Sequence, residues 1–435
     1  DGMARLGLSP DSKIGARQAD CGFDVWHRDD GLWGQGPDGF YDELRSPYNE
    51  YLKSKGYDGE NPWHDYANAA DDEGAMASGW IFANADKPAN IAEEDSETPW
   101  LTSETIKFMQ QAKGPWCAHV SYIKPHWPYI VPAPYHDMYG PNTHMPVVRH
   151  DAEQEDPHPV YDAFMQERVS KAFTNETTRT KVIGAYMGLI KQIDDQMGEL
   201  MAYLEAKGLT EDTMIVFTSD HGDYLGDHWL GEKELFHDPS ARIPLIVVDP
   251  SPEADATRGT VSEALVEAID LTPTFLDYFG GADVPHIIEG KSLLPLLHGK
   301  QEAVREFVVS EYDYSFRQVR RRLGVSVAYA KLTMLFDGRW KFVFAEGFRP
   351  MLFDLETDPD EFQDLGGDPV YAAECDRMQG LFFQWTRRTS QRTTMSNAEI
   401  ERRGDDLGAA KAGVLIGFAT EAELQAALDA DTEHS

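Results

Sequence analysis

The chain has 435 residues, 41% of them hydrophobic, which is enough to bury a sizeable core and favours one large domain with a smaller one. Its 39 Lys plus Arg against 75 Asp plus Glu give a net charge of −36. A field of that sign repels phosphate backbones and anionic lipid headgroups, which excludes nucleic acid and membrane surfaces as preferred partners. Because the field also repels small anions at long range, an anion-binding site must be built locally from a metal ion or a few lysines.

The cysteines and the start of the chain bear on its compartment. Cys21, Cys117 and Cys375 are widely spaced and odd in number, which fits reduced thiols better than a disulfide framework. No run of about 20 apolar residues could span a bilayer, and no secretory signal pattern stands near residue 1. We therefore expect a cytoplasmic protein. A periplasmic one is the alternative, because the chain opens with Asp1, lacks the first strand of an α/β domain and so has the form of a fragment.

The first regular elements are predicted in the first half of the chain. Residues 21–100 show little periodicity, which indicates loops and short helices. Residues 117–122 form a short apolar run that predicts a buried strand, and two prolines end it. Apolar side chains then recur at three- and four-residue spacing, which predicts one long amphipathic helix over about 178–207 with Gly208 as its C-cap.

Two fully apolar strands come next, at 213–218 and 243–248. Apolar strands separated by helical stretches predict an α/β fold with a mostly parallel sheet sandwiched by helices, and functional residues lie at the carboxyl ends of such strands. We assign residues 1–304 to this domain. Short strands with tight polar turns predict a smaller antiparallel sheet in a subdomain over 305–389. The polar, helical stretch 390–435 is either a frayed tail or an arm that joins a homo-oligomer.

The sharpest chemical signal follows the first of these strands. Asp220 and His221 are adjacent at its end, and Gly222 lets the backbone turn, so a carboxylate and an imidazole can both face one divalent cation. The alternative is an Asp that caps the next turn beside an exposed His. Lys233 follows through a loop that contains glycines, and a lysine returned toward a cation makes sense if an anion lies between them. Taken alone, Lys233 would be a solvated surface lysine.

A second chemical signal is the loop that begins at Lys124. Lys124-Pro125-His126 places a cation and a titratable ring in a turn that proline stiffens. Such a pair can hold an anion and protonate a leaving oxygen, since histidine donates a proton near neutral pH. The alternative is a proline-rich turn with an incidental His. Five further histidines lie in predicted loops without ligand-like partners, and we expect them at the surface: His136, His158, His237, His286 and His298.

Seven sequence features occur in a characteristic order along the chain. They are Lys124-Pro125-His126-x-Pro128, Ser219-Asp220-His221-Gly222-Asp223-x-Leu225-Gly226-Asp227-His228, Lys233, Arg242-Ile243-Pro244-Leu245, Asp270-Leu271-x-Pro273-Thr274, Gly290-Lys291-Ser292-Leu293-Leu294-Pro295-Leu296 and Leu352-Phe353-Asp354-Leu355-x-x-Asp358-Pro359-x-Glu361. This is the order seen in sulfatases, and together the features are very specific. The chain resembles the sulfatase family of the alkaline phosphatase superfamily over about residues 115–385, and it is similar to the branch of phosphonate monoester hydrolases and arylsulfatases in particular.

This resemblance implies an alkaline-phosphatase-like fold, one divalent metal ion, Ca²⁺ or Mn²⁺, and a small anionic ester as the substrate. By the same resemblance, Asp220 and His221 are expected to be metal ligands. Lys233 and Lys124 are expected to contact the anionic group of the substrate, and His126 to bind that group or to assist the leaving group.

The resemblance also implies a nucleophile. In the family, the Cys or Ser of a Cys-x-Pro-x-Arg or Ser-x-Pro-x-Arg motif is converted to formylglycine, and the hydrated aldehyde attacks the ester. None of the three cysteines stands in such a motif. We therefore expect the formylglycine upstream of Asp1, and negligible turnover by these 435 residues alone.

The sequence thus predicts a metal-dependent hydrolase of sulfate esters, phosphonate monoesters or phosphodiesters. Two alternatives stay open at this point. The first is a two-metal phosphodiesterase or phosphatase of the same superfold, which would need a further set of Asp and His ligands, whereas residues 293–298 have the pattern of a packed helix end. The second is a non-catalytic binding homologue that has kept the fold without the nucleophile.

Overall fold

The computed structural model describes residues 23–27, 29, 46–140, 146–281, 288–387 and 415–432. Cys21, His286 and residues 390–414 of the predicted tail lie outside the described residues. The chain divides into two compact units, and both carry residues that the sequence singled out. The first unit comprises Asp1–Val147, Glu167–Lys207 and Thr394–Ser435, and the second comprises Val148–Gln166 and Gly208–Thr393.

The longest element of the first unit is the helix α7 (Glu176–Ala206), which confirms the helix predicted over about 178–207. Asn175 caps its start, since the Asn175 side chain accepts a hydrogen bond from the Thr178 N–H. Gly208 follows its end with φ +65°, a left-handed conformation that glycine adopts without strain. The buried apolar face of α7 consists of Val182, Ala185, Leu189, Ile193, Leu200 and Leu204.

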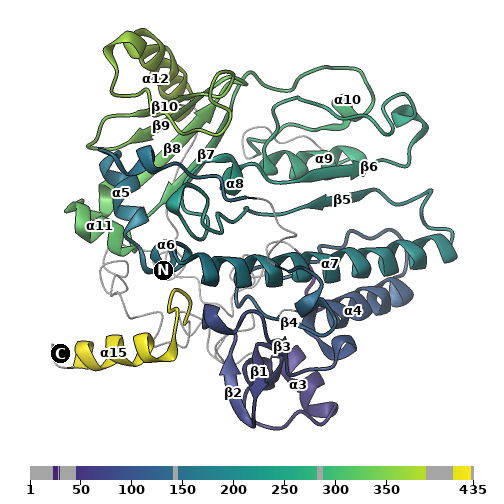
Figure 1. The fold of residues 1–435 in the computed structure, drawn as a ribbon. Helices are drawn as coiled ribbons and strands as arrows, with labels where there is room; N and C mark the ends of the chain where they lie inside the picture. Colours follow the sequence, from purple (N-terminus) through teal and green to yellow (C-terminus); the bar gives the residue numbers. More distant parts are fainter. Residues whose placement is uncertain are drawn as a thin grey trace, which may run out of the picture. The chain divides into compact units, whose positions relative to one another are not determined.

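Shorter elements accompany α7 in the first unit. The helix α4 (Glu97–Gln111) lies alongside α7 (Figure 1). β1 (Ala69–Asp72) and β2 (Ala75–Ser78) form an antiparallel ribbon, and β3 (Pro88–Ala89) pairs in parallel with β4 (Val131–Pro132). The other described elements of this unit are α3 (Pro47–Ser54), α6 (Arg168–Phe173), α15 (Glu421–Thr432), the π-helical turn η1 (Trp63–Ala67) and the 3₁₀ turns η2 (Phe82–Asn84), η3 (Glu93–Asp95) and η4 (Tyr135–Asp137).

The buried strand predicted at 117–122 is wrong. The structure assigns no strand to these residues, and Cys117, Ala118 and His119 are exposed. An apolar run becomes a strand only when a neighbouring strand satisfies its N–H and C=O groups. None of the strands in the described part of the chain pairs with this segment.

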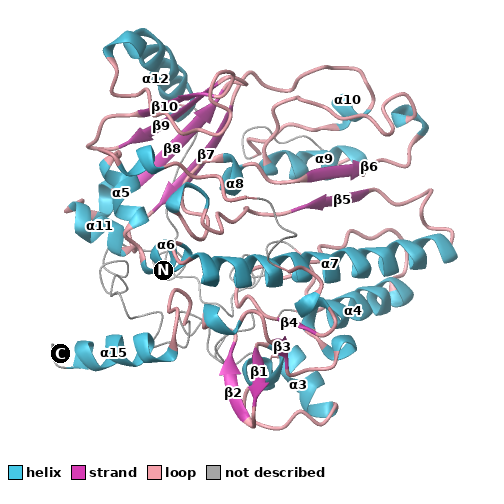
Figure 2. Cartoon of the chain, viewed as in Figure 1, coloured by secondary structure: helices cyan, strands magenta, loops and turns pink. Residues whose placement is uncertain are grey.

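In the second unit, β5 (Ile215–Thr218) and β6 (Leu245–Val248) coincide with the two predicted apolar strands, but they pair antiparallel rather than in parallel. The reason lies in the connection between them. Residues 219–244 contain the turn η6 (Asp227–Trp229) and the four-residue helix α8 (Asp238–Ala241), whereas the crossover of a parallel pair is usually a helix long enough to run back along the sheet (Figure 2). The chain therefore reverses between the two strands and returns beside β5.

The predicted antiparallel subdomain is confirmed. Four strands pair in the order β10-β9-β8-β7, and α12 (Ala372–Thr386) covers one face of the sheet (Figure 1). Met378 of α12 packs there against Phe342, and α5 (Pro159–Met165) contributes Phe164 to the other main core of this unit. The strands are β7 (Val308–Asp313), β8 (Lys331–Phe336), β9 (Trp340–Ala345) and β10 (Met351–Asp354).

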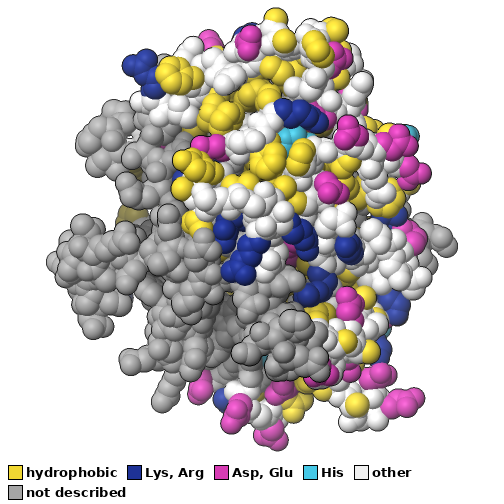
Figure 3. Space-filling model, turned by 90° about the vertical axis from the view of Figure 1, so that its left-hand side faces the viewer, with side chains coloured by type: hydrophobic (Ala, Val, Ile, Leu, Met, Phe, Trp, Pro, Cys, Tyr) yellow, Lys and Arg dark blue, Asp and Glu magenta, His cyan; other side chains and the backbone are white. Residues whose placement is uncertain are grey.

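Some apolar side chains of the second unit reach the surface. Ile246 of β6 is 59% exposed, so this strand is not covered on both faces as predicted. Hydrophobic side chains also show at the top of Figure 3. Phe383 of α12 is among the exposed ones. No helix among the described residues is both long enough and apolar enough to cross a membrane.

The remaining described elements of the second unit are short helices and turns. They are η5 (Asp151–Gln154), η7 (Pro252–Ala254), η8 (Ala268–Asp270), α9 (Leu271–Tyr278), α10 (Leu294–Leu297), α11 (Gln318–Leu323), η9 (Val327–Tyr329) and η10 (Pro369–Tyr371).

Candidate active site

Asp220 and His221 form a turn directly after β5. The Asp220 side chain is 88% exposed, and its Oδ2 lies 3.5 Å from His221 Nε2. The other ring nitrogen, Nδ1, lies 2.8 Å from the carbonyl oxygen of Gly222. Because a carbonyl oxygen only accepts hydrogen bonds, this contact places a proton on Nδ1. Nε2 is then the ring nitrogen that a metal ion would use, with Nδ1–H held by a backbone carbonyl.

The two side chains fit part of the ligand set of a divalent cation. Two atoms bound to one ion at about 2.0–2.5 Å each lie about 3–3.5 Å apart, and the 3.5 Å between Asp220 Oδ2 and His221 Nε2 agrees with this. A mixed oxygen and nitrogen pair suits a borderline cation such as Mn²⁺. In the described ranges, no group of three or more His, Cys, Asp or Glu side chains is placed to hold a metal ion. Asp220 and His221 would therefore supply two of its ligands.

Gly222 is required by close packing of the backbone. A Cβ atom at this position would stand 1.9 Å from the carbonyl oxygen of Pro239, so no other residue fits without a shift of α8. The Gly222 N–H donates to the carbonyl oxygen of Ser240 at 2.8 Å. The Ser240 hydroxyl in turn donates to the carbonyl oxygen of Lys233 at 2.5 Å. Ser240 thus contacts both the backbone that follows Asp220 and His221 and the backbone of Lys233.

Lys233 returns through a tight loop, as its glycines predicted. The Tyr224 N–H donates to the Glu232 carbonyl oxygen at 2.8 Å, and the Gly226 N–H donates to the Leu230 carbonyl oxygen at 2.9 Å. These two bonds close the loop on itself. The return brings Lys233 back to α8, the helix against which the Asp220–His221 turn is also bonded.

The backbone of this loop is strained. Leu225, His228, Trp229 and Glu232 have φ values of 47°, 52°, 61° and 60°, in the left-handed region that residues other than glycine avoid. Each such residue costs about 1–3 kcal/mol, and the conformation persists only where surrounding contacts determine it. The loop that carries Lys233 is therefore held in place by its neighbours.

Acidic side chains flank Lys233. The Lys233 N–H donates to Glu234 Oε2 at 3.1 Å, and the Arg317 guanidinium lies 3.0 Å from Glu234 Oε1 and 3.7 Å from Glu232 Oε2. Burial and repulsion from Glu234 raise the pKa of Glu232 to about 7, against the attraction of Arg317. Protonation of Glu232 below that pH would increase the positive charge around Lys233.

Two of the histidines expected at the surface, His158 and His237, are buried. The His237 ring stacks on His228, with centroids 4.1 Å apart and planes at 17°. His228 Nδ1 lies 2.7 Å from Glu153 Oε1, and His237 Nδ1 lies 2.9 Å from the Tyr224 hydroxyl. Burial holds the pKa of His237 well below its usual range, so this ring stays neutral. His228 belongs to the strained loop, so its stacking on His237 helps to hold that loop in place.

Lys124 and His126 belong to the first unit, whereas the other three predicted site residues belong to the second. The Lys124 side chain is buried, with Nζ 2.8 Å from Asn68 Oδ1 and 2.7 Å from the Pro128 carbonyl oxygen. The His126 ring is half-buried and packs on Trp127, with centroids 4.2 Å apart. In the first unit, therefore, the ring is nearer the surface than the ammonium group.

No local pattern in the sequence indicates the buried carboxyl beside Lys124. Glu97, the first residue of α4, is buried beside it, and both side chains line a small cavity with Asn68 and Gln192. Burial raises the pKa of Glu97 to about 7, although Lys124 opposes this shift. Burial likewise lowers the pKa of Lys124 to about 8, and Glu97 opposes that shift. Glu97 was missed because it stands in the acidic run 93–97 at a helix start, where carboxylates normally meet solvent.

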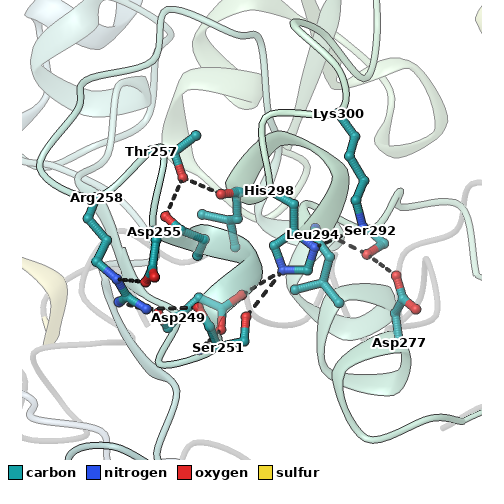
Figure 4. A network of polar contacts seen from close by, with 12 residues as sticks. Asp249, Ser251, Asp255, Thr257, Arg258, Asp277, Ser292, Leu294, His298 and Lys300 are labelled. Carbon is teal, nitrogen blue, oxygen red and sulfur yellow. Dashed lines mark hydrogen bonds and ion pairs between the residues drawn. The ribbon is translucent and has the colours of Figure 1, made fainter.

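A further polar cluster ties the end of β6 to the end of α10 (Figure 4). His298, expected at the surface, has its Nε2 2.9 Å from Asp249 Oδ2 and 3.5 Å from Ser251 Oγ. A nucleophile–base–acid relay uses the two ring nitrogens for different partners. Here both oxygens meet the same nitrogen, so the cluster is a structural tie between two chain segments.

Two family models match the chain. The model described as Sulfatase matches residues 49–282, which is more than half of the chain. The model described as N-sulphoglucosamine sulphohydrolase, C-terminal, matches residues 226–386, including the four-stranded sheet. The chain therefore belongs to the sulfatase family, and the resemblance drawn from the sequence features is confirmed.

Individual relatives agree with this membership. A phosphonate monoester hydrolase from Silicibacter pomeroyi superimposes with a TM-score of 0.69 at 30% identity, over 80% of this chain and 70% of that one. The corresponding values for one from Agrobacterium radiobacter are 0.68, 28%, 79% and 69%. These neighbours confirm the predicted alkaline-phosphatase-like fold. The multifunctional alkaline phosphatase superfamily protein PehA from Trinickia caryophylli is 34% identical over 66% of this chain, which spans 59% of the length of that relative.

Proposed function

We propose that the protein is a metal-dependent hydrolase of singly charged esters, namely sulfate esters, phosphonate monoesters and phosphodiesters. One observation carries the proposal: a carboxylate oxygen of Asp220 and Nε2 of His221 lie 3.5 Å apart on a loop that brings back Lys233. Membership of the sulfatase family and similarity to two phosphonate monoester hydrolases support the class of reaction.

Each candidate residue has a role that its chemistry allows. Asp220 and His221 would hold one divalent cation, Ca²⁺ or Mn²⁺, which when bound supplies positive charge to the ester oxygens. Lys233 would neutralise further charge on those oxygens. His126 would bind the anionic group or donate a proton to the leaving oxygen. For the nucleophile we retain a formylglycine, which the family resemblance implies.

The role of Lys124 needs a rearrangement. It stays a candidate contact for the anionic group, but its ammonium donates to Asn68 and to the Pro128 carbonyl oxygen. To reach a substrate, Lys124 would have to exchange these two contacts. His126 lies in the same turn with its ring half-buried and Nδ1 3.1 Å from the Trp127 carbonyl oxygen.

Three further proposals concern the domain bounds, the C-terminal stretch and the cellular location. We propose that residues 1–304 form the sulfatase-like domain and 305–389 its antiparallel subdomain, which agrees with the four-stranded sheet between Val308 and Asp354. We propose that 390–435 is a tail or an oligomerisation arm. Cys117 and Cys375 are free thiols, which supports a reducing, cytoplasmic location.

The test compares four esters with the same nitrophenyl leaving group: a sulfate, a phenylphosphonate, a phosphodiester and a phosphate monoester. The protein expressed from its complete gene should hydrolyse the first three with kcat/KM at least about a hundredfold above the phosphate monoester, because a second unbalanced charge in a partly dehydrated site is costly. Chelation of divalent metal should abolish the activity. A clear preference for the phosphate monoester would contradict the proposal.

A further inference from the structure

We propose that Glu361 and Lys341 are positioning residues of the active site. They fix α8, and through α8 they set the separation between Lys233 and the Asp220–His221 turn. This inference rests on the proposed function of that loop. It also gives a role to Glu361, the last residue of the sequence feature at 352–361, to which the resemblance assigned no role.

Lys341 is the centre of the arrangement. It lies on β9 with only 3% of its side chain exposed, and its ammonium has three acceptors. Nζ lies 2.7 Å from Asp238 Oδ1, 2.6 Å from Glu361 Oε1 and 3.0 Å from the Phe236 carbonyl oxygen. The Glu361 contact is held by charge, since Oε1 lacks a well-aligned hydrogen bond. A buried ammonium with this set of acceptors is fixed in one place.

Glu361 connects the ammonium to the start of α8. Its second oxygen, Oε2, accepts a hydrogen bond from the Asp238 N–H at 2.7 Å. Asp238 is the first residue of α8, so its N–H has no acceptor within that helix. Glu361 therefore caps α8 from outside, while the Asp238 carboxylate faces Lys341. The antiparallel sheet and α8 are joined through both oxygens of one buried carboxylate.

α8 connects Lys341 and Glu361 to the Asp220–His221 turn and to Lys233. Ser240, two residues after Asp238, accepts a hydrogen bond from the Gly222 N–H and donates one to the Lys233 carbonyl oxygen. A displacement of α8 would move both contacts at once. Gly222 and Lys233 stand on either side of the strained loop from Leu225 to Glu232, which needs rigid neighbours to keep its left-handed residues. Loss of the anchor should therefore loosen this loop before it loosens the sheet.

The sequence contains a signal for this role. Lys341 interrupts the apolar strand Trp340-Lys341-Phe342-Val343, and it points into the core rather than to solvent. A charged residue on a buried strand face requires a buried partner. Glu361 is that partner, and it belongs to an acidic sequence feature shared with the family.

The test is hydrogen exchange measured by mass spectrometry on Glu361→Ala, with Asp354→Ala as the matched control. Asp354 is a buried carboxylate of the same sequence feature, but its ion pair is with Arg339 and its hydrogen bonds do not reach α8. Glu361→Ala should speed exchange of the amides between 222 and 238 by about tenfold or more, with β8 and β9 unchanged. Asp354→Ala should leave these loop amides within about twofold of the wild type.

Activity gives the second readout. Glu361→Ala should lower kcat for the best ester by about tenfold to a hundredfold, and Asp354→Ala by less than about threefold. If Glu361→Ala does not fold, Glu361→Gln keeps the acceptor for the Asp238 N–H and should show the same effects at smaller size. Unchanged loop exchange in the Glu361 variants, or equal acceleration in Asp354→Ala, would overturn the inference. Faster loop exchange in a protein that hydrolyses no ester would uphold the positioning role and reject the proposed function.

Discussion

Among the described residues, each unit buries one lysine, and the polar surroundings of the two lysines differ. Lys341 in the second unit has two carboxylate oxygens within 2.7 Å of its ammonium. Lys124 in the first unit donates to an amide oxygen and a carbonyl oxygen, both neutral, and Glu97 acts on it only through the field between them. The charge of Lys341 is therefore balanced by carboxylates at contact distance. The charge of Lys124 is only partly balanced.

The difference shows what each buried lysine can do. A buried ammonium held by carboxylates keeps its charge and fixes whatever is attached to those carboxylates. Where a buried ammonium is held only by neutral groups, burial lowers its pKa, so it loses its proton more readily. Burial raises the pKa of the carboxyl that faces it, so that carboxyl takes up a proton more readily. Lys341 is therefore suited to anchor α8. Lys124 and Glu97 are suited to change charge near neutral pH under the His126 turn.

Replacing each lysine by methionine should separate the two cases most strongly. Lys341→Met leaves the Glu361 carboxylate buried without its cation, which should lower the free energy of unfolding by about 3–5 kcal/mol. Lys124→Met at pH 6 should cost less than about 2 kcal/mol, because Glu97, with a pKa of about 7, is then already mostly protonated and leaves no buried charge unpaired. Urea denaturation of both variants at pH 6 measures the difference. Equal costs at the two positions would remove the distinction.

A smaller effect should appear in the pH dependence of stability. Burial raises the pKa of Glu97 from 4.5 to about 7 in the folded protein. Between these pH values the folded state binds more protons than the unfolded state, so the contribution of Glu97 to stability falls as the pH rises. Lys124 acts in the opposite sense at higher pH. Its folded pKa of about 8 lies below 10.5, so its contribution rises with pH between those values.

Glu97→Gln isolates the carboxyl. At pH 5 the variant should match the wild type, because Glu97 is then protonated and neutral. By pH 7.5 the variant should be more stable than the wild type by about 1–3 kcal/mol. Glu94→Gln, at an exposed position one turn earlier, is the control and should show no such trend. A difference between Glu97→Gln and the wild type that does not change with pH would contradict this assignment.

The sequence predicted those parts of the fold that local pattern determines. The periodic run before Gly208 forms α7, and the short strands beyond 305 form the antiparallel sheet. The direction of β6 relative to β5 was not predictable in this way, because it depends on whether the connection can cross over. The segment 117–122 failed for a related reason, since strand formation depends on a partner that the segment itself does not encode.

In the candidate site, too, some features follow from nearby residues and others depend on tertiary contacts. The adjacency of Asp220 and His221 and the tight return to Lys233 follow from nearby residues, and the structure contains both. The anchoring of that loop by Glu361 depends on a contact across more than a hundred residues, which no local pattern reveals. The burial of Lys124 against Asn68 and Glu97 depends likewise on tertiary packing. Spacing thus predicted which groups could act, and packing determines how they are held.

Metal retention by Asp220→Asn is the most direct test of the central claim, that Asp220 and His221 hold a cation required for ester hydrolysis. The wild type should carry about one divalent ion per chain by elemental analysis, and Asp220→Asn should bind it at least about tenfold more weakly and lose hydrolysis in proportion. Asp255→Asn, which alters an exposed carboxylate paired with Arg258, should behave as the wild type. If Asp220→Asn keeps both its metal and its activity, the Asp220–His221 turn is not the metal site.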